Sequence, residues 1–217
     1  MTAAQRLQTI HGNIARAAKL AGRDSADVTL VAVTKTRSSR EIEALIEAGQ
    51  RDFGENRVQE AKEKWPALLA NHPELRLHCI GRLQSNKAAE AVRLFDSIHS
   101  VDRKSLLDAL VKESEKAGRL PSVYVQVNVG EEPQKGGCAI AEAGEMVAAV
   151  RASALPLAGL MGVPPIGLEP SPFFALLAKL ARRHGVSGLS MGMSADYEAA
   201  VELGATAVRV GSALFED

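Results

Sequence analysis

The stretch VTLVAVTK, residues 28–35, decides the fold. Residues 28–33 are apolar or β-branched and lack the alternation of a half-exposed strand, a pattern typical of a parallel strand covered on both faces. The preceding segment has apolar residues at helical spacing from Leu7 to Ala18. That spacing predicts an additional helix before the first strand.

The chain after Lys35 repeats this pattern of helix and strand. Apolar segments predict seven further strands, at residues 52–54, 77–80, 97–101, 123–129, 157–163, 188–190 and 207–210. Helical periodicity predicts helices at residues 39–48, 58–70, 86–95, 104–117, 139–152, 173–184 and 195–203. Eight strands that alternate with helices indicate parallel strands with right-handed crossovers.

The predicted fold class is therefore α/β, as a single (β/α)8 TIM barrel with an extra N-terminal helix and with residues 1–217 as one domain. An open, doubly wound parallel sheet is the alternative. Its dinucleotide-binding form carries a glycine-rich loop after the first strand, whereas VTKTRS, residues 33–38, stands there.

The composition excludes several classes of partner. With 26 basic and 26 acidic residues, the formal net charge is +0, so no bulk attraction to nucleic acid or to a membrane surface is expected. Cys79 and Cys138 have no CxxC spacing, which predicts reduced thiols and no metal site. The sequence has no signal-peptide core and no stretch of ~20 apolar residues, so a cytoplasmic protein is expected.

In such a barrel, chemistry gathers at the carboxyl ends of the strands. Lys35 ends the first strand, and a lysine beside apolar walls would lose part of its preference for the ammonium form and become a better nucleophile. The alternative is a lysine at the rim of the barrel with its amine in water. The position of Lys35 alone does not decide between them.

The last two strand ends have the composition of a phosphate site. Gly192 and Gly211 would let backbone N–H groups approach an anion, and Ser194 and Ser212 would supply hydroxyl groups. Ser194 is equally a candidate N-cap for the helix at residues 195–203.

Arg209 is expected to project into the barrel beside this loop, or else to form a buried ion pair with Glu55 or another acid. A lysine, a phosphate site and an arginine together suit a cofactor with an aldehyde, a phosphate and a ring nitrogen.

Several stretches resemble a known family, the pyridoxal phosphate homeostasis proteins or proline synthetase co-transcribed homologues, which are similar to the N-terminal barrel of alanine racemase. The matching stretches are VAVTKT, FGENRVQEAKEK, HCIGRLQSNK, VNVGEEPQKGG, GLMGVP and LSMGMSADYEAAVELGATAVRVGSALF. The resemblance implies that Lys35 forms the internal aldimine with pyridoxal 5′-phosphate and that Arg209 faces the pyridine nitrogen. It also implies that Asn56 lies near the ring and that Ser194, Gly211 and Ser212 hold the phosphate.

The expected function follows from the arginine and from this resemblance. Arginine cannot deliver a proton to the ring as a carboxylic acid would, so the ring would be a weak electron sink. The resemblance implies a monomer that stores, delivers or buffers pyridoxal phosphate with little or no catalysis, and it leaves open delivery to apo-enzymes. The alternatives are a pyridoxal-phosphate-dependent amino-acid racemase and a lysine Schiff-base aldolase.

Overall fold

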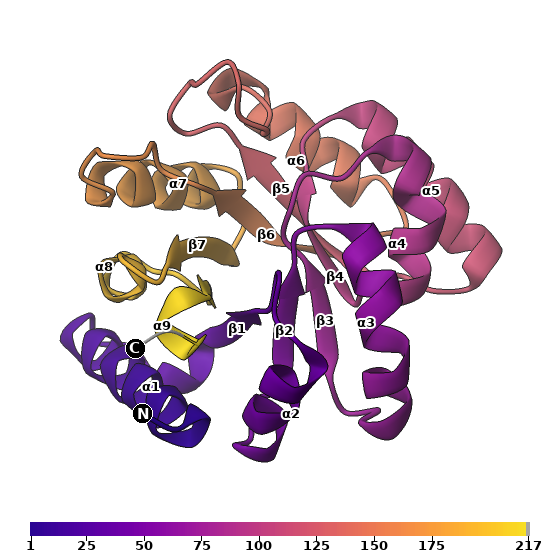
Figure 1. Cartoon of the computed structure of the whole chain (residues 1–217). Helices are drawn as coiled ribbons and strands as arrows, with labels where there is room; N and C mark the ends of the chain where they lie inside the picture. Colours follow the sequence, from indigo (N-terminus) through magenta and orange to yellow (C-terminus); the bar gives the residue numbers. More distant parts are fainter. Residues whose placement is uncertain (216–217) are drawn as a thin grey trace.

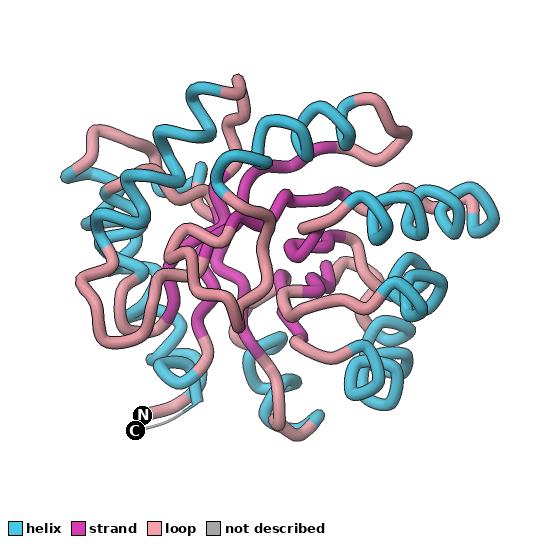
Figure 2. The backbone as a smooth tube through the Cα atoms, turned by 90° about the horizontal axis from the view of Figure 1, so that it is seen from above, coloured by secondary structure: helices cyan, strands magenta, loops and turns pink. Residues whose placement is uncertain are grey.

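The computed structural model describes residues 1–215 and contains a closed barrel of eight parallel strands. The strands pair in chain order, and β8 pairs with β1 to close the barrel, which rules out the open sheet. Figure 2 shows the strands at the centre with the helices around them. The strands are β1 (Thr29–Val33), β2 (Asp52–Glu55), β3 (Arg76–Cys79), β4 (Ser97–Val101), β5 (Ser122–Val127), β6 (Leu157–Gly162), β7 (Leu189–Met193) and β8 (Ala207–Val210).

Helices follow the strands and cover the outside of the barrel (Figure 1). Their apolar faces join the strands in one buried core. The helices are α1 (Ala3–Leu20), α2 (Ser39–Glu47), α3 (Val58–Asn71), α4 (Ala88–Leu94), α5 (Lys104–Ala117), α6 (Ala143–Arg151), α7 (Ser171–Arg183), α8 (Tyr197–Glu202) and α9 (Ser212–Phe215). Short 3-10 turns occupy Ser25–Asp27, Ser85–Lys87 and Ile140–Glu142.

The extra N-terminal helix is confirmed as α1. A capping box between Thr2 and Gln5 begins it, and its apolar face is buried. Asn13 donates a hydrogen bond of 2.8 Å to the Tyr197 hydroxyl of α8, and Arg16 forms an ion pair of 2.6 Å with Glu198. These contacts place α1 beside α8, next to the closing seam of the barrel (Figure 1).

Some predicted boundaries differ from those of the structure for local reasons. The strand expected at residues 123–129 ends at Val127 because the chain turns at Asn128. The Asn128 carbonyl accepts from the N–H of Glu131, and its amide side chain donates to the Glu132 carbonyl at 2.8 Å. This turn opens the long loop that leads to α6.

The two cysteines are buried and form no disulfide, as predicted. Burial raises the pKa of both thiols to about 12, so neither is a thiolate at neutral pH. Among residues 1–215, no helix combines the length and apolar character needed to cross a membrane.

Candidate functional site

A pocket of about 570 Å³ opens at the carboxyl ends of the strands. The structure brings all six predicted binding residues into its lining: Lys35, Asn56, Ser194, Arg209, Gly211 and Ser212. Val33, Ile80 and Val163 add apolar surface. The strand ends therefore gather at one site, as the barrel geometry requires.

Lys35 lies in a tight turn directly after β1. The N–H of Arg37 donates to the Thr34 carbonyl at 3.0 Å and closes the turn. Lys35 is exposed, and its amine has no hydrogen bond or ion pair with any residue of the described chain. The alternative of a lysine at the rim of the barrel fits this position, because the turn carries Lys35 out of the buried strand to the mouth of the pocket.

The next residue, Thr36, has a strained backbone. Its φ is 62°, in the left-handed region that β-branched residues rarely adopt. Such a conformation persists only where the surroundings impose it, and it is found preferentially at functional sites. The Thr36 hydroxyl donates to the Lys35 carbonyl at 2.6 Å, which adds a local contact to the turn.

Two charged side chains of α3 form hydrogen bonds with the backbone of this turn. The Glu60 carboxylate accepts the Thr36 N–H at 2.6 Å, and the Lys64 amine donates to the Thr34 carbonyl at 2.8 Å. Lys64 also pairs with Glu60 at 3.0 Å and with Glu55 at 2.8 Å. Burial opposes ionisation of Glu60, but the hydrogen bonds from Thr36 and Lys64 outweigh it and lower the pKa of that carboxyl.

The buried Glu55 therefore belongs to the support of the lysine turn. Its Oε1 accepts hydrogen bonds from the Thr34 hydroxyl at 2.7 Å and from the Trp65 indole at 2.9 Å, in addition to the Lys64 contact. The alternative that Glu55 pairs with Arg209 is wrong.

Ser194 bridges the two loops expected to hold a phosphate. Its Oγ accepts the N–H of Gly211 at 3.0 Å and that of Ala213 at 3.5 Å. The N-cap alternative is wrong, because α8 begins at Tyr197 and its N-cap is Asp196.

This arrangement leaves backbone N–H groups free at the pocket. In residues 1–215, the N–H groups of Ser194, Ala195 and Ser212 have no hydrogen-bond partner. All three residues line the pocket. We call Ser194, Ala195, Gly211 and Ser212 the anion cradle, because free backbone N–H groups at a loop attract anions.

Gly192 has a packing role instead of the expected approach to an anion. It does not line the pocket, and its φ is 92°. A Cβ on this residue would lie 2.5 Å from the Cβ of Ala200 and 3.0 Å from the Cα of Tyr197. Glycine is therefore required where β7 packs against α8.

Arg209 points into the barrel and is only 5% exposed. One terminal nitrogen donates to the Ser190 hydroxyl at 2.6 Å, and the other donates to the Gly162 carbonyl at 3.1 Å. It makes no ion pair with any described residue. Burial lowers the pKa of Arg209 to about 10, against smaller opposing effects of Asp196 and Tyr124, so the guanidinium stays charged at neutral pH.

A chain of hydrogen bonds continues from Arg209 through the barrel. His99 Nδ1 lies 2.8 Å from the Ser190 hydroxyl, His99 Nε2 lies 3.0 Å from His78 Nδ1, and His78 Nε2 lies 3.0 Å from Asp52 Oδ1. We call these five residues the axial network. Asp52 begins β2, so the network runs from the opposite end of the barrel to the pocket.

The two ends of this chain have defined hydrogen-bond directions. Arginine only donates, so the Ser190 hydroxyl accepts from Arg209, and at the other end the Asp52 carboxylate accepts from His78 Nε2. Burial, aided by His78 and Arg209, holds the pKa of His99 well below its usual value, so this ring is neutral.

The sequence reasoning missed this network and the residues that hold the lysine turn. The available signal was the presence of polar residues inside strands expected to be covered on both faces, such as His78 and His99. Lys64 and Glu60 carried no comparable signal, because charged residues on a helix are usually solvated.

Comparison with known proteins places this architecture in a family. The family model described as alanine racemase, N-terminal domain, matches residues 5–217. A pyridoxal phosphate homeostasis protein of Pseudomonas aeruginosa is 42% identical over 221 residues, which cover 99% of this chain and 95% of that protein.

Solved structures agree. The structure of PipY from Synechococcus elongatus with PLP bound is 37% identical, with a TM-score of 0.84 over 98% of this chain and 99% of that chain. Alanine racemase from Corynebacterium glutamicum is 19% identical, with a TM-score of 0.66 over 96% of this chain and 60% of that chain, and it shares the fold. With such identity to its relatives over nearly its whole length, the chain belongs to the family of the pyridoxal phosphate homeostasis proteins.

Proposed function

We propose that this protein binds pyridoxal 5′-phosphate through the amine of Lys35 and serves its homeostasis by storing, delivering or buffering it. The protein acts as a monomer in the cytoplasm, with residues 1–217 as one cofactor-binding domain and with little or no catalysis of its own. The observation that carries the proposal is the juxtaposition, in one pocket, of an unpartnered lysine amine, a buried arginine and free backbone N–H groups.

Each part of the cofactor has a matching group in the pocket. The anion cradle offers the N–H groups of Ser194, Ala195 and Ser212 to the phosphate. The Lys35 amine is free to attach the aldehyde carbon. Arg209 uses one N–H on Ser190 and one on Gly162, which leaves further donors for the ring nitrogen.

The chemistry of the pocket favours binding of the cofactor over catalysis with it. The bound cofactor supplies a conjugated ring that can withdraw electrons, but a ring nitrogen that faces a guanidinium receives no proton from it. Racemisation needs an acid or base on each face of the substrate carbon. Among the described residues, the pocket lining contains no carboxylate, histidine or tyrosine.

The two tyrosines are used elsewhere. Tyr197 accepts a hydrogen bond from Asn13 of α1, and Tyr124 packs against His99 with ring centroids 4.2 Å apart. Neither lines the pocket. The similarity to PipY, whose structure has PLP bound, further supports the cofactor, and the name of the Pseudomonas aeruginosa relative supports homeostasis.

The test is a titration of the purified protein with pyridoxal phosphate, followed by visible absorption. We expect Lys35→Ala to abolish the absorption change of the covalently bound cofactor, whereas Lys179→Ala, at an exposed lysine of α7, leaves it unchanged. The loaded parent protein is then incubated with single amino-acid enantiomers. Sustained loss of optical rotation would show a racemase, and an unchanged titration in Lys35→Ala would refute the lysine assignment.

A further inference from the structure

A second pocket lies beside the cofactor pocket and is larger, at about 700 Å³ against about 570 Å³. The two pockets share Asn56 in their linings. The loops after β2, β3 and β4 and the start of α3 form its walls, and apart from Asn56 the proposed cofactor chemistry uses none of its lining residues. We call it the basic pocket.

Its lining is cationic and polar. Four side chains carry positive charge, namely Arg57, Arg82, Lys87 and Arg103, and none of the lining residues is acidic. Five further side chains are amides or hydroxyls, and only two are apolar. Such a surface disfavours an apolar or cationic ligand and favours an anion that also carries many hydrogen-bonding groups.

Two of the four cations already have an acidic partner within the protein. Arg103 pairs with Asp102 at 2.5 Å, and Lys87 pairs with Glu90 at 3.3 Å. Arg57 and Arg82 are exposed and make no ion pair with any residue of the described chain. These two guanidinium groups therefore remain available for a ligand.

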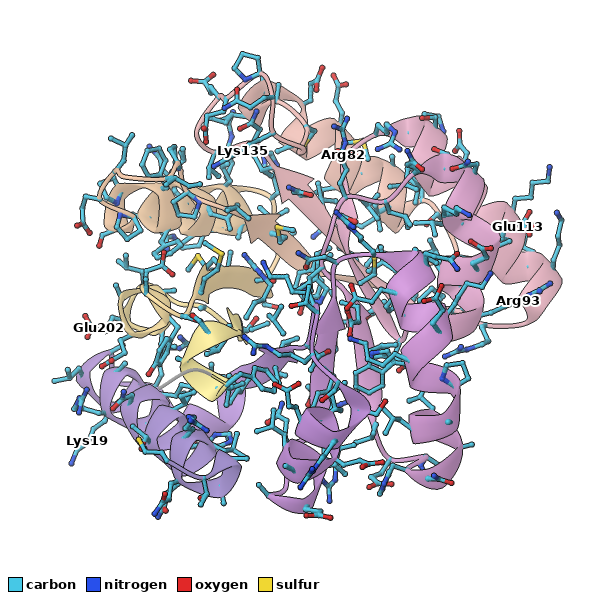
Figure 3. The ribbon with its side chains drawn as sticks, in the orientation of Figure 1. Lys19, Arg82, Arg93, Glu113, Lys135 and Glu202 are labelled. Atoms are coloured by element: carbon cyan, nitrogen blue, oxygen red, sulfur yellow. The ribbon has the colours of Figure 1, made fainter. Side chains whose placement is uncertain are left out.

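The two free arginines, Arg57 and Arg82, have different neighbours. Arg57 contributes to lowering the pKa of Glu60, but that carboxylate is held by Thr36 and Lys64. Arg82, labelled in Figure 3, lies beside Gly136 in the loop after β5. Two free arginine forks in one pocket can bind phosphate oxygens with paired hydrogen bonds.

The walls of the basic pocket are fixed before any ligand binds. A Cβ on Gly81 would lie 2.1 Å from the Asn56 carbonyl oxygen, so the loops after β2 and β3 are in direct backbone contact. Arg103 donates to the Leu83 carbonyl at 2.9 Å and to the Ser85 hydroxyl at 3.4 Å, which ties the loop after β3 to the loop after β4. A preformed pocket needs little ordering upon binding.

We propose that the basic pocket binds a phosphorylated, hydroxyl-rich small molecule, a sugar phosphate or the sugar phosphate part of a nucleotide. Arg57 and Arg82 hold its phosphate, and the amide and hydroxyl side chains hold its hydroxyl groups. The volume exceeds what inorganic phosphate requires and suits a molecule of nucleotide size. The site stands apart from the anion cradle and does not depend on the proposed cofactor role.

The test is calorimetric titration with ribose 5-phosphate and with ADP, compared with ribose, adenosine and inorganic phosphate. Cofactor-loaded protein reduced with borohydride is used, so that the anion cradle is filled. Mass spectrometry checks before the titration that the cofactor is attached. If it is not attached, that failure concerns the proposed function alone, and the untreated protein is titrated instead. Comparing ribose 5-phosphate with ADP also shows whether the pocket prefers a free sugar phosphate or a nucleotide.

The discriminating variant is Arg57→Gln/Arg82→Gln, and its matched control is Arg182→Gln/Arg183→Gln, which removes the same charge from exposed arginines of α7. At least one phosphorylated probe should bind the parent and the control, and should bind the Arg57/Arg82 variant at least about tenfold more weakly. The proposal fails if neither phosphorylated probe binds the parent at about 10 mM. It also fails if both double variants lose affinity equally, or if inorganic phosphate or an unphosphorylated probe binds as tightly.

Discussion

At the scale of single residues, Thr36 and Ser190 determine the positions of two side chains of the pocket, Lys35 and Arg209. Thr36 has an unfavourable backbone φ of 62°, and the turn with this conformation exposes the Lys35 amine. Ser190 is fully buried and is the acceptor that fixes one arm of Arg209. Neither side chain need touch the cofactor, yet each sets the position of a group that we propose contacts it.

Replacing Ser190 with alanine tests this positioning role. The variant loses the acceptor for Arg209 and the hydrogen-bond partner of His99 Nδ1, so we expect the free energy of unfolding to fall by about 2 kcal/mol. Ser114→Ala is the matched control, because Ser114 is equally buried and its hydroxyl has no partner in the described structure. Urea denaturation of both variants checks this, and equal stability of the two would contradict it.

Replacing Ser194 with alanine tests the anion cradle. The hydroxyl orders the two loops by accepting the N–H groups of Gly211 and Ala213. Affinity for pyridoxal phosphate should fall about tenfold, since a charge-assisted contact worth about 1.5 kcal/mol is disturbed. Affinity for pyridoxal, which lacks the phosphate, should change little. Equal losses in a fluorescence titration with both ligands would place the phosphate elsewhere.

At the scale of elements, the packing of α8 on β7 sets the geometry of the anion cradle. The sequence pattern predicted a helix from residue 195, but the turn at residues 194–196 delays it to Tyr197. The Asp196 carboxylate accepts the Met193 N–H at 2.5 Å and shapes this turn. Because α8 begins later, Ser194 lies outside the helix and its hydroxyl can accept the N–H of Gly211 in the loop after β8.

A pair of glycine variants measures this packing. Gly192→Ala should destabilise the protein by about 3 kcal/mol, because the new Cβ meets the Ala200 Cβ and the φ of 92° is unfavourable. Gly204→Ala has a similar φ of 105° but only a contact of 3.5 Å with Leu189, so it should cost about 1 kcal/mol. Thermal unfolding compares the two, and equal losses would refute the packing argument.

The elements with strong periodicity were predictable from sequence, as β4 and α5 agree with their expected bounds. The gathering of Lys35, Ser194 and Arg209 was also predictable, because barrel topology brings strand ends together. Contacts between distant residues were not. Periodicity shows that His78 and His99 lie in strands, but only strand tilt and register show that they meet each other inside the barrel.

At the scale of the whole molecule, the axial network links the two ends of the barrel. At its far end, burial opposes ionisation of Asp52, but hydrogen bonds from His78 and Arg76 outweigh it and lower the pKa of that carboxyl. The buried His99 lies among His78, Ser190, Tyr124 and Arg209. The axial network orients Arg209 through the Ser190 hydroxyl, and no described residue forms an ion pair with this guanidinium.

The pH dependence of stability tests the neutrality of His99. Its pKa is lowered well below 6.5 in the folded protein, so only the unfolded chain gains this proton as the pH falls below that value. This proton uptake makes stability decrease toward acid. Between about pH 7.5 and about pH 5.5, this histidine should contribute a loss of about 1.4 kcal/mol.

His99→Gln should remove that contribution from the difference in unfolding free energy between the two pH values. Gly204→Ala, which weakens the protein without removing a titratable group, should keep it. Urea denaturation of the parent and both variants provides the measurement. A pH difference in His99→Gln that matches the parent would show that His99 is not the neutral, buried base described above.

The central claim, that Lys35 carries the cofactor, is tested most directly by mapping the site of attachment. Protein loaded with pyridoxal phosphate is reduced with borohydride, digested and analysed by mass spectrometry. Because the Lys35 amine faces the pocket without a partner, we expect a single pyridoxyl label per chain, on Lys35. A label on Lys87 or Lys135 instead, or labels spread over several surface lysines, would contradict the account.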